Sequence, residues 1–381
     1  MKKVFPILAL SMFSATLGIG VVSPLLPLYA RDMGATGIWL GVIFSAYAIS
    51  NSIAVPIVGR LSDRKGRKAF LTIGLLINAI ISLGYVWAAT PTHLALVRFI
   101  QGVAGAVTYP IAMAYLGDLS PEREEGKWMG YATAAFFSGF GFGPLLGGVL
   151  TDYFGVSATF YTMGGLNLLA FFVALFFLPE SGHRKTSEKV SQLSFKEMST
   201  SGIIRGLFTF RLAQALGRGA LFTFLPIFAV KLGVSLSLIG ALIAVSILAW
   251  LLFTPIGGII ADRFNRITLV IAGNIIFSLL LVMIPLTNSF GQLLAVLVIQ
   301  GLSGALVMPA ASALDVEEGR KYGMGSSMSV YFLAMGIGMA IGPLISGGIA
   351  DWLNVDSVFY FGGITGFIGT GLFFWFTKHY R

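Results

Sequence analysis

Long uncharged, apolar runs alternate along the chain with short clusters of charged residues. Several of these runs are about as long as one membrane-crossing helix, which needs roughly 20 apolar residues. They cover residues 4–30, 33–59, 128–151, 153–179, 232–261 and 357–377. The pattern therefore predicts a protein built from membrane-spanning helices.

Two longer runs each predict a pair of helices. Residues 267–314 form an uncharged run that would be about 72 Å long as one helix, more than twice the ~30 Å hydrocarbon thickness of a bilayer. This run must turn back once, and residues 288–291 (NSFG) are the best place for the turn. The run after Lys68 predicts a similar turn near residues 90–93, and the total comes to twelve spans.

The composition excludes an ordinary soluble protein and several kinds of chemistry. Of the 381 residues 56% are hydrophobic and only 11% are charged, whereas soluble domains are about 25% charged. The absence of cysteine excludes disulfides, thiol redox chemistry and cysteine metal sites, and three scattered histidines do not suggest zinc. We therefore expect no metal and no cofactor.

The basic residues are distributed unevenly between the two sides of the predicted membrane protein. With both termini inside the cell, the inner loops contain 20 of the 25 Lys and Arg residues, and the outer loops contain only Arg31 and Lys231. This asymmetry is the positive-inside rule, so the net charge of +9 indicates orientation rather than a nucleic-acid partner. We expect a multi-pass protein of the cytoplasmic (inner) membrane, surrounded by lipid bilayer, with both termini cytoplasmic.

The sequence repeats itself after 199 residues without a gap. The matching pairs include Gly18 and Gly217, Asp63 and Asp262, Gln101 and Gln300, and Pro144 and Pro343. A constant offset over six spans predicts two homologous six-helix bundles, which run parallel because six is even. Bundles repeated in this way are typical of transporters in which two halves rock around a central site.

The repeat also predicts the domain boundaries of an all-α membrane protein. An N-terminal six-helix bundle covers residues 1–178, a polar cytoplasmic linker covers 179–202, and a C-terminal six-helix bundle covers 203–381. A short surface helix is predicted in the linker at residues 195–198.

Three motifs occur in order within the first half. GRLSDRKGRK (59–68) lies between the second and third spans, LALVRFIQG (94–102) lies in the fourth, and GFGFGPLLGG (139–148) lies in the fifth. Together they resemble the signatures of the major facilitator superfamily, and in particular its twelve-span drug/proton antiporter-like branch. The resemblance covers the whole chain and implies the major facilitator fold.

The first motif implies a charged gate on the cytoplasmic side. The glycines permit a tight turn, and the resemblance implies that its charged residues contact the other half and the acid that ends the fourth span. The gate residues are Gly59, Asp63, Arg64, Gly66, Arg67 and Asp118, with a second copy at Asp262, Arg263, Arg266 and Glu317. Because Asn265 replaces Gly66, the second copy is expected to be weaker. The alternative is that the basic residues only bind anionic lipid and set the topology.

The motif in the fifth span places small residues every three or four positions around a proline. Its residues are Gly139, Gly143, Pro144, Gly147 and Gly148, with Gly342 and Pro343 in the eleventh span. This spacing allows close helix packing and a bend. Family members with this motif are mostly exporters, so the resemblance favours export, whereas packing alone is the alternative.

Arginines inside the predicted spans indicate a binding site. A charge at this depth is unfavourable and usually faces a wet cavity. The candidate cavity residues are Arg98, Gln101, Gln214, Arg218 and Gln300. Arg211 is near enough to the membrane surface to extend to water. The alternative is that Arg98 and Arg218 bind backbone carbonyls and are structural, and aromatic residues such as Phe136 are not counted in the site.

We expect no acidic residue well inside a span, because each candidate lies at a predicted helix end. These candidates are Asp32, Asp118, Asp152, Asp315, Asp351 and Asp356. The first span lacks the acid of related antiporters, which argues against a cationic-drug site and against a proton carrier there. An arginine without an acid favours an anionic substrate instead.

These features predict a secondary transporter that works by alternating access. The favoured activity is proton-coupled efflux of an amphipathic small molecule, with anions among the candidates, by a protein acting as a monomer. The alternatives are a proton symporter or facilitator for uptake of an organic anion or sugar derivative, and a non-transporting membrane sensor. No catalytic constellation or channel-like polar stripe is present in the sequence, so neither an enzyme nor a channel is expected.

Overall fold

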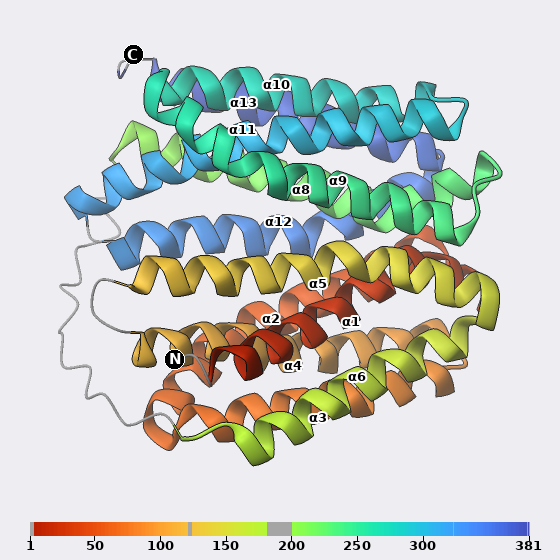
Figure 1. Ribbon diagram of the computed structural model, residues 1–381. Coiled ribbons are helices and arrows are strands. Elements are labelled where there is room, and N and C mark those ends of the chain that lie inside the picture. Colours follow the sequence, from red (N-terminus) through yellow and green to blue (C-terminus); the bar gives the residue numbers. More distant parts are fainter. Residues whose placement is uncertain (1–3, 121–123, 181–199, 323, 379, 381) are drawn as a thin grey trace. The chain divides into compact units, whose positions relative to one another are not determined.

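The computed structural model describes residues 4–120, 124–180, 200–322, 324–378 and 380 (Figure 1). In this part of the chain, twelve helices are long and apolar enough to cross a membrane. The first six are α1 (Phe5–Asp32), α2 (Gly37–Lys65), α3 (Arg67–Trp87), α4 (Pro91–Leu119), α5 (Glu125–Phe154) and α6 (Val156–Phe177). The other six are α8 (Gly202–Lys231), α9 (Leu236–Arg263), α10 (Arg266–Met283), α11 (Phe290–Tyr322), α12 (Met324–Trp352) and α13 (Val355–Thr377). The prediction of an all-α membrane protein with twelve spans is confirmed.

Both turns predicted inside the long apolar runs are present. Helix α3 ends at Trp87 and α4 begins at Pro91, where the Thr90 side chain accepts a hydrogen bond from the backbone N–H of His93. The second turn follows a 3₁₀ helix, η1 (Ile284–Leu286), and precedes α11. In each case polar side chains bind the backbone groups that a helix end leaves unpaired.

The chain forms two compact units. The first consists of Met1–Thr186 and Gly233–Ala244, and the second of Ser187–Leu232 and Val245–Arg381. The short segment Gly233–Ala244, which includes the start of α9, thus belongs to the first unit. There the carboxylate of Asp152 accepts hydrogen bonds from the backbone N–H and the hydroxyl of Ser237, at 2.8 and 2.6 Å.

The predicted linker is described only at its two ends. The short helix expected at residues 195–198 lies outside the described residues.

Glycines bring α1 and α5 into close contact in the first unit. A Cβ atom built on Gly143 would lie 2.7 Å from the Cα of Gly20, and one on Gly147 would lie 2.5 Å from the carbonyl oxygen of Val21. Between helices that lie in lipid, backbone approach of this kind is a main source of attraction, because burying apolar side chains gains little there. The small residues of this motif therefore hold two helix backbones together.

The second unit repeats this packing with α8 and α12. A Cβ atom on Gly342 would lie 2.8 Å from the carbonyl oxygen of Leu216, and one on Gly219 would lie 2.8 Å from Cδ of Pro343. The counterparts of these two contacts 199 positions earlier are Gly143 to the carbonyl oxygen of Leu17, at 2.7 Å, and Gly20 to Cδ of Pro144, at 3.0 Å. The same pairs of positions therefore make close contacts in both units. Each unit also has an apolar core in its half of the chain, around Leu71 and Ile111 in the first and around Val270 and Ala311 in the second.

Replacing Gly143 with alanine should destabilise the protein. The added methyl group must push α1 away, and overpacking of this kind costs about 1–3 kcal/mol. The matched control is Gly165→Ala on α6, where nothing lies within 4 Å of the added atom. Thermal unfolding of the purified variants in detergent checks this, and equal unfolding temperatures for the two variants would contradict the packing account.

Candidate functional site

The first charged motif forms the turn between α2 and α3. Gly66 has φ +91°, and a Cβ atom there would lie 2.6 Å from Oε1 of Glu180. The same Oε1 atom accepts hydrogen bonds from the backbone N–H groups of Arg67 and Lys68, at 3.0 and 3.2 Å. Glycine is therefore required at position 66 for two reasons. It adopts the positive φ, and it lets the Glu180 carboxylate approach and cap the start of α3.

Arg67 connects three helices in this region. Its guanidinium group forms ion pairs with Asp63 at 2.8 Å and with Asp118 at the end of α4, and it lies 3.3 Å from the Ser62 hydroxyl. We call Asp63, Arg67 and Asp118 the first charged cluster. Of the other predicted gate residues, Arg64 is exposed on the last turn of α2, and nothing lies within 4 Å of a Cβ atom built on Gly59.

The second copy forms a matching but more exposed arrangement. Arg266 pairs with Glu317 and, at 3.5 Å, with Asp262, and we call these three residues the second charged cluster. Asn265 takes over the capping role, because its side chain accepts the backbone N–H of Thr268 at 3.1 Å. Arg263 is exposed on the last turn of α9. The second copy has Asn265 at the position that Gly66 occupies in the first. This difference changes how helix α10 is capped, whereas Arg266, like Arg67, binds two carboxylates.

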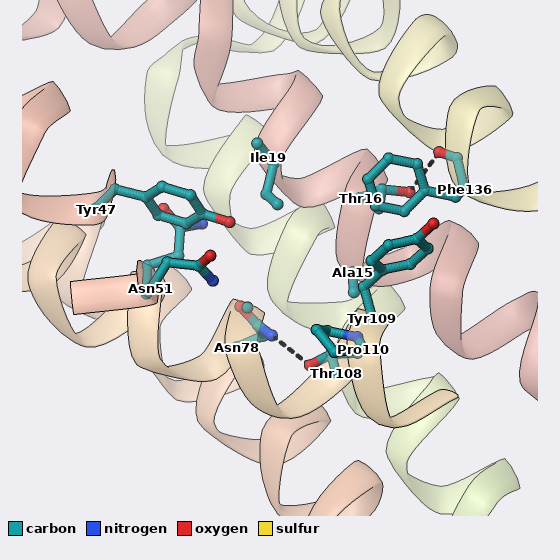
Figure 2. A pocket seen from close by; sticks show the side chains of 12 residues that line it. Ala15, Thr16, Ile19, Tyr47, Asn51, Asn78, Thr108, Tyr109, Pro110 and Phe136 are labelled. Atoms are coloured by element: carbon teal, nitrogen blue, oxygen red, sulfur yellow. Dashed lines mark hydrogen bonds between the residues drawn. The ribbon is translucent and has the colours of Figure 1, made fainter. Parts of the chain in front are cut away.

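A cavity of about 150 Å³ lies inside the first unit (Figure 2). Its lining residues come from α1, α2, α3, α4 and α5, and none of them is charged. They are Ala15, Thr16, Ile19, Tyr47, Asn51, Asn78, Gln101, Gly105, Thr108, Tyr109, Pro110 and Phe136. The cavity is thus mostly apolar with a few hydroxyl and amide groups, as is usual for sites that bind small molecules.

Arg98 does not line this cavity but supports a residue that does. Its guanidinium carbon lies 5.0 Å from the ring centroids of both Phe44 and Tyr47, and its NH1 group donates a hydrogen bond to Oε1 of Gln101 at 2.9 Å. The hydroxyl of Tyr85 donates to the same oxygen at 2.6 Å. The guanidinium group of Arg98 is therefore held by the Gln101 side chain and by the rings of Phe44 and Tyr47.

These two bonds determine how the Gln101 amide is oriented. An arginine can only donate, so the oxygen of the amide must face Arg98 and the nitrogen must point elsewhere. The Nε2 atom is buried and has no hydrogen-bond partner among the described residues. Gln101 is one of the residues that line the cavity, so this buried unpaired donor lies close to it. A ligand acceptor that reached the N–H groups would satisfy them.

The other amides of the cavity wall are held by backbone groups. The nitrogen of Asn51 donates to the carbonyl of Gly102 at 3.0 Å, and that of Asn78 donates to the carbonyl of Gly74 at 3.0 Å. Figure 2 also shows the contact between Asn78 and Thr108. Except for Gln101, the sequence motifs do not identify the cavity residues, although an asparagine within an apolar run is a usable signal.

The predicted residues of the second half lie in the second unit. Gln214 and Gln300 are buried, and the Oε1 atom of the former and the Nε2 atom of the latter have no partner among the described residues. The guanidinium carbon of Arg218 lies 5.9 Å from the ring centroid of Phe277. That these three residues share one cavity with Arg98 and Gln101 stays a prediction.

The predicted helix-end position of Asp315 is wrong for α11. This helix continues to Tyr322, so Asp315 lies inside the bundle with only 5% of its surface exposed. Its Oδ2 atom lies 3.3 Å from NH2 of Arg211, which is 1% exposed and therefore does not extend to water. Glu318 is buried one turn further on and binds Ser201 and Lys321.

Metal ligation is not supported in the described part of the chain. Among those residues no group of three or more His, Asp or Glu side chains is placed to hold a metal ion.

Comparison with known proteins identifies relatives along the whole chain. The model of the Major Facilitator Superfamily matches residues 8–231 and 207–381. An uncharacterised MFS-type transporter of Methanocaldococcus jannaschii is 27% identical over 368 residues, which cover 95% of each chain. Multidrug resistance protein 2 of Bacillus subtilis is 29% identical over 97% of this chain and 94% of its own. The quinolone resistance protein NorA of Staphylococcus aureus is 26% identical over 94% and 92%.

A solved structure shows the same fold. The crystal structure of a bacterial homologue of the human lysosomal transporter Spinster matches with a TM-score of 0.83 at 16% identity. The match covers 98% of this chain and 96% of that one.

Loss of Arg67 should destabilise the protein more than loss of Arg266. Both arginines bind two carboxylates, but the side chains of Arg67 and Asp118 are 14% and 22% exposed, against 28% and 46% for Arg266 and Glu317. We expect about 2 kcal/mol for Arg67→Ala, as for a charged hydrogen bond away from water, and below about 1 kcal/mol for Arg266→Ala. Thermal unfolding compares them, and an equal or larger effect at Arg266 would be evidence against the difference between the clusters.

Proposed function

The chain belongs to the Major Facilitator Superfamily of membrane transporters, and on this premise we propose that it exports an amphipathic small molecule in exchange for protons. The exchange would proceed by alternating access, in a monomer of the cytoplasmic (inner) membrane with both termini inside the cell. The family and the relatives consist of transporters, so the chain is not an enzyme.

The observation that carries the proposal is the cavity of the first unit. At about 150 Å³ it is smaller than the ~300–1,000 Å³ of drug-sized pockets, so it suits one aromatic ring with its substituents. Tyr47, Tyr109 and Phe136 supply aromatic surface, and the Gln101 amide supplies a donor. An aromatic molecule with a carbonyl or similar acceptor matches both features.

The geometry favours an uncharged substrate over an anionic one. None of the described residues that line the cavity is charged, and Arg98 already binds Gln101 and two aromatic rings. The Nε atom of Arg98 has no partner among the described residues, but Arg98 does not line the cavity, so an anion there would reach it only after the wall moved. The anionic alternative therefore requires a rearrangement that an uncharged substrate does not.

Export is supported by relatives and by the motif of α5. Two of the relatives carry names that refer to drug resistance. The glycine motif that the resemblance associates with exporters is complete in α5 and makes the contacts with α1 described above. Proton exchange provides the driving force in this proposal.

Transport by the purified protein tests the proposal directly. In proteoliposomes, radiolabelled chloramphenicol serves as an uncharged aromatic probe with an amide carbonyl, and a pH gradient across the membrane should drive its accumulation. Counterflow of chloramphenicol without any gradient, and with no response to one, would instead favour a facilitator. Absence of both would contradict a transport function for this class of substrate.

Replacing Gln101 with glutamate should change the substrate preference. The carboxylate still accepts from Arg98 and Tyr85, but the two N–H donors are lost. We expect chloramphenicol to bind about tenfold more weakly, equivalent to about 1.4 kcal/mol, while the cationic probe tetraphenylphosphonium binds no more weakly than before. Equilibrium binding in detergent measures both.

The matched control is Gln292→Glu. This residue is exposed at the start of α11, so the same substitution should leave both probes unaffected. Unchanged chloramphenicol binding by Gln101→Glu would show that the amide does not contact the probe.

A further inference from the structure

The second unit contains a buried ion pair that the cavity of the first unit does not use. Arg211 on α8 and Asp315 on α11 are joined by one hydrogen bond, from NH2 to Oδ2 at 3.3 Å. The NH1 group of Arg211 contacts the sulfur of Met308 at 3.0 Å, and its Nε has no partner among the described residues. The pair is therefore almost completely buried but only sparsely hydrogen-bonded.

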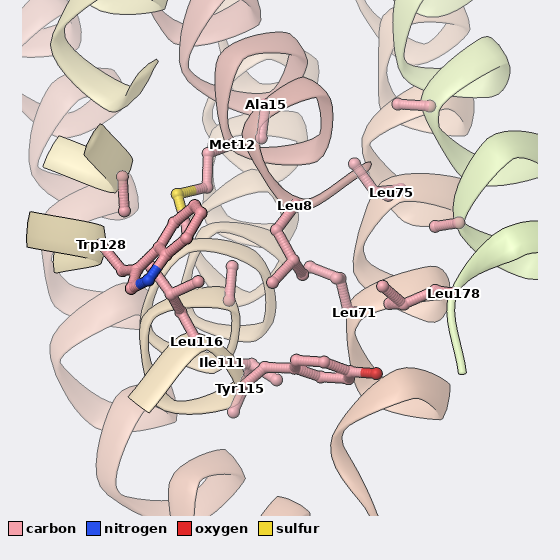
Figure 3. Close-up of a cluster of buried hydrophobic side chains, with 14 residues drawn as sticks. Leu8, Met12, Ala15, Leu71, Leu75, Ile111, Tyr115, Leu116, Trp128 and Leu178 are labelled. Atoms are coloured by element: carbon pink, nitrogen blue, oxygen red, sulfur yellow. The ribbon is translucent and has the colours of Figure 1, made fainter. Parts of the chain in front are cut away.

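The internal repeat shows what occupies the same place in the first unit. Counting back 199 residues from Arg211, Asp315 and Tyr331 leads to Met12, Leu116 and Ala132. All three belong to one buried apolar cluster of the first unit, and each is fully buried. Met12 and Leu116 are labelled in Figure 3. One copy of the fold thus fills this position with hydrocarbon, and the other fills it with an ion pair beside a tyrosine.

This comparison argues against a purely structural role for the ion pair. The first unit shows that the fold packs well here without charges. A buried ion pair is usually no more stabilising than apolar side chains of similar volume, because both charges must lose their water. A pair kept at such a position is therefore better explained by an activity that needs a charge.

Among the neighbouring carboxylates of α11, Asp315 is the one best placed to change its charge. Glu318, on the same helix, binds Ser201 and Lys321, and Glu317 binds Arg266. From α12, Ser327 donates to the backbone carbonyl of Asp315, and the ring centroid of Tyr331 lies 4.5 Å from the guanidinium carbon of Arg211. Arg218, two turns further along α8, is the next cation. Among the described residues, the carboxylate of Asp315 is thus held by one hydrogen bond, from Arg211.

We propose that Asp315 is the proton-carrying residue of the exchange and that Arg211 is its partner. When the site opens to one side of the membrane, the carboxylate takes a proton from water, becomes a neutral acid and releases Arg211. When it opens to the other side, the proton returns to water and the ion pair re-forms. Each cycle moves one proton and changes no other bond. The proposal rests on the proton exchange described under Proposed function.

Arg211 explains why protonation would be linked to movement. A neutral Asp315 leaves the guanidinium group buried without a counter-charge, beside the rings of Phe210 and Tyr331. That state is unfavourable, so protonation favours any arrangement in which Arg211 reaches water. A proton bound at Asp315 thereby shifts the balance between the conformations of the transporter.

The repeat itself supplies the variant that tests the proposal. The double variant R211M/D315L gives the second unit the side chains that the first unit has at these positions, so it should fold and unfold at the wild-type temperature or above. We expect wild-type chloramphenicol counterflow in proteoliposomes, but at least tenfold less accumulation driven by a pH gradient. Asp315→Asn resembles the protonated acid but leaves Arg211 without its counter-charge, so we expect it to lose the accumulation driven by a pH gradient and to be less stable than the double variant.

The control removes a different ion pair. Lys231 and Asp356 form an exposed pair at 3.2 Å, and K231M/D356L should keep both counterflow and accumulation.

The outcomes separate this proposal from the proposed function. Wild-type accumulation by R211M/D315L or by Asp315→Asn would show that the proton is carried elsewhere. Loss of counterflow together with accumulation, in a folded variant, would show that the pair serves the movement itself, and would also overturn the proposal. If the wild-type protein shows no counterflow at all, the proposed function fails instead.

Discussion

A polar side chain inside the hydrocarbon layer must find its partner within the protein, because no water is available there to replace one. This constraint acts on the buried polar side chains of both units. It accounts for Arg98, whose guanidinium group is held by Gln101, Phe44 and Tyr47. It also accounts for the orientation of the Gln101 amide, whose oxygen is used by two donors so that its nitrogen remains available. The chemistry proposed for the cavity follows from that one unpaired group.

The duplicated architecture shows how one backbone arrangement supports two different interiors. Glycines at corresponding positions bring α1 against α5 and α8 against α12, so the framework of the two units is alike. The side chains within this framework have diverged, with a cavity and an apolar core in the first unit and the Arg211–Asp315 pair in the second. Division of labour between the halves, with substrate contacts in one and proton binding in the other, is the simplest functional interpretation of this divergence.

The helices and turns could be predicted from the sequence because charges mark where an apolar run must end. The burial of Asp315 could not, because α11 continues past the acids that were expected to end it, and helix length near a membrane surface depends on tertiary packing. The cavity could not be predicted from the sequence either, because it forms only when the helices pack. It is lined by residues such as Tyr47, Asn78 and Phe136 from three different helices, and only their packing brings them together.

The central claim is that a small molecule and protons move in opposite directions through this protein. The most direct measurement uses proteoliposomes that contain a pH-sensitive dye such as pyranine and start with no pH gradient. When chloramphenicol is added outside, its inward movement should drive protons out, so the interior should become more alkaline. An interior pH that stays constant while chloramphenicol enters through the protein would contradict the account, and acidification would show symport instead.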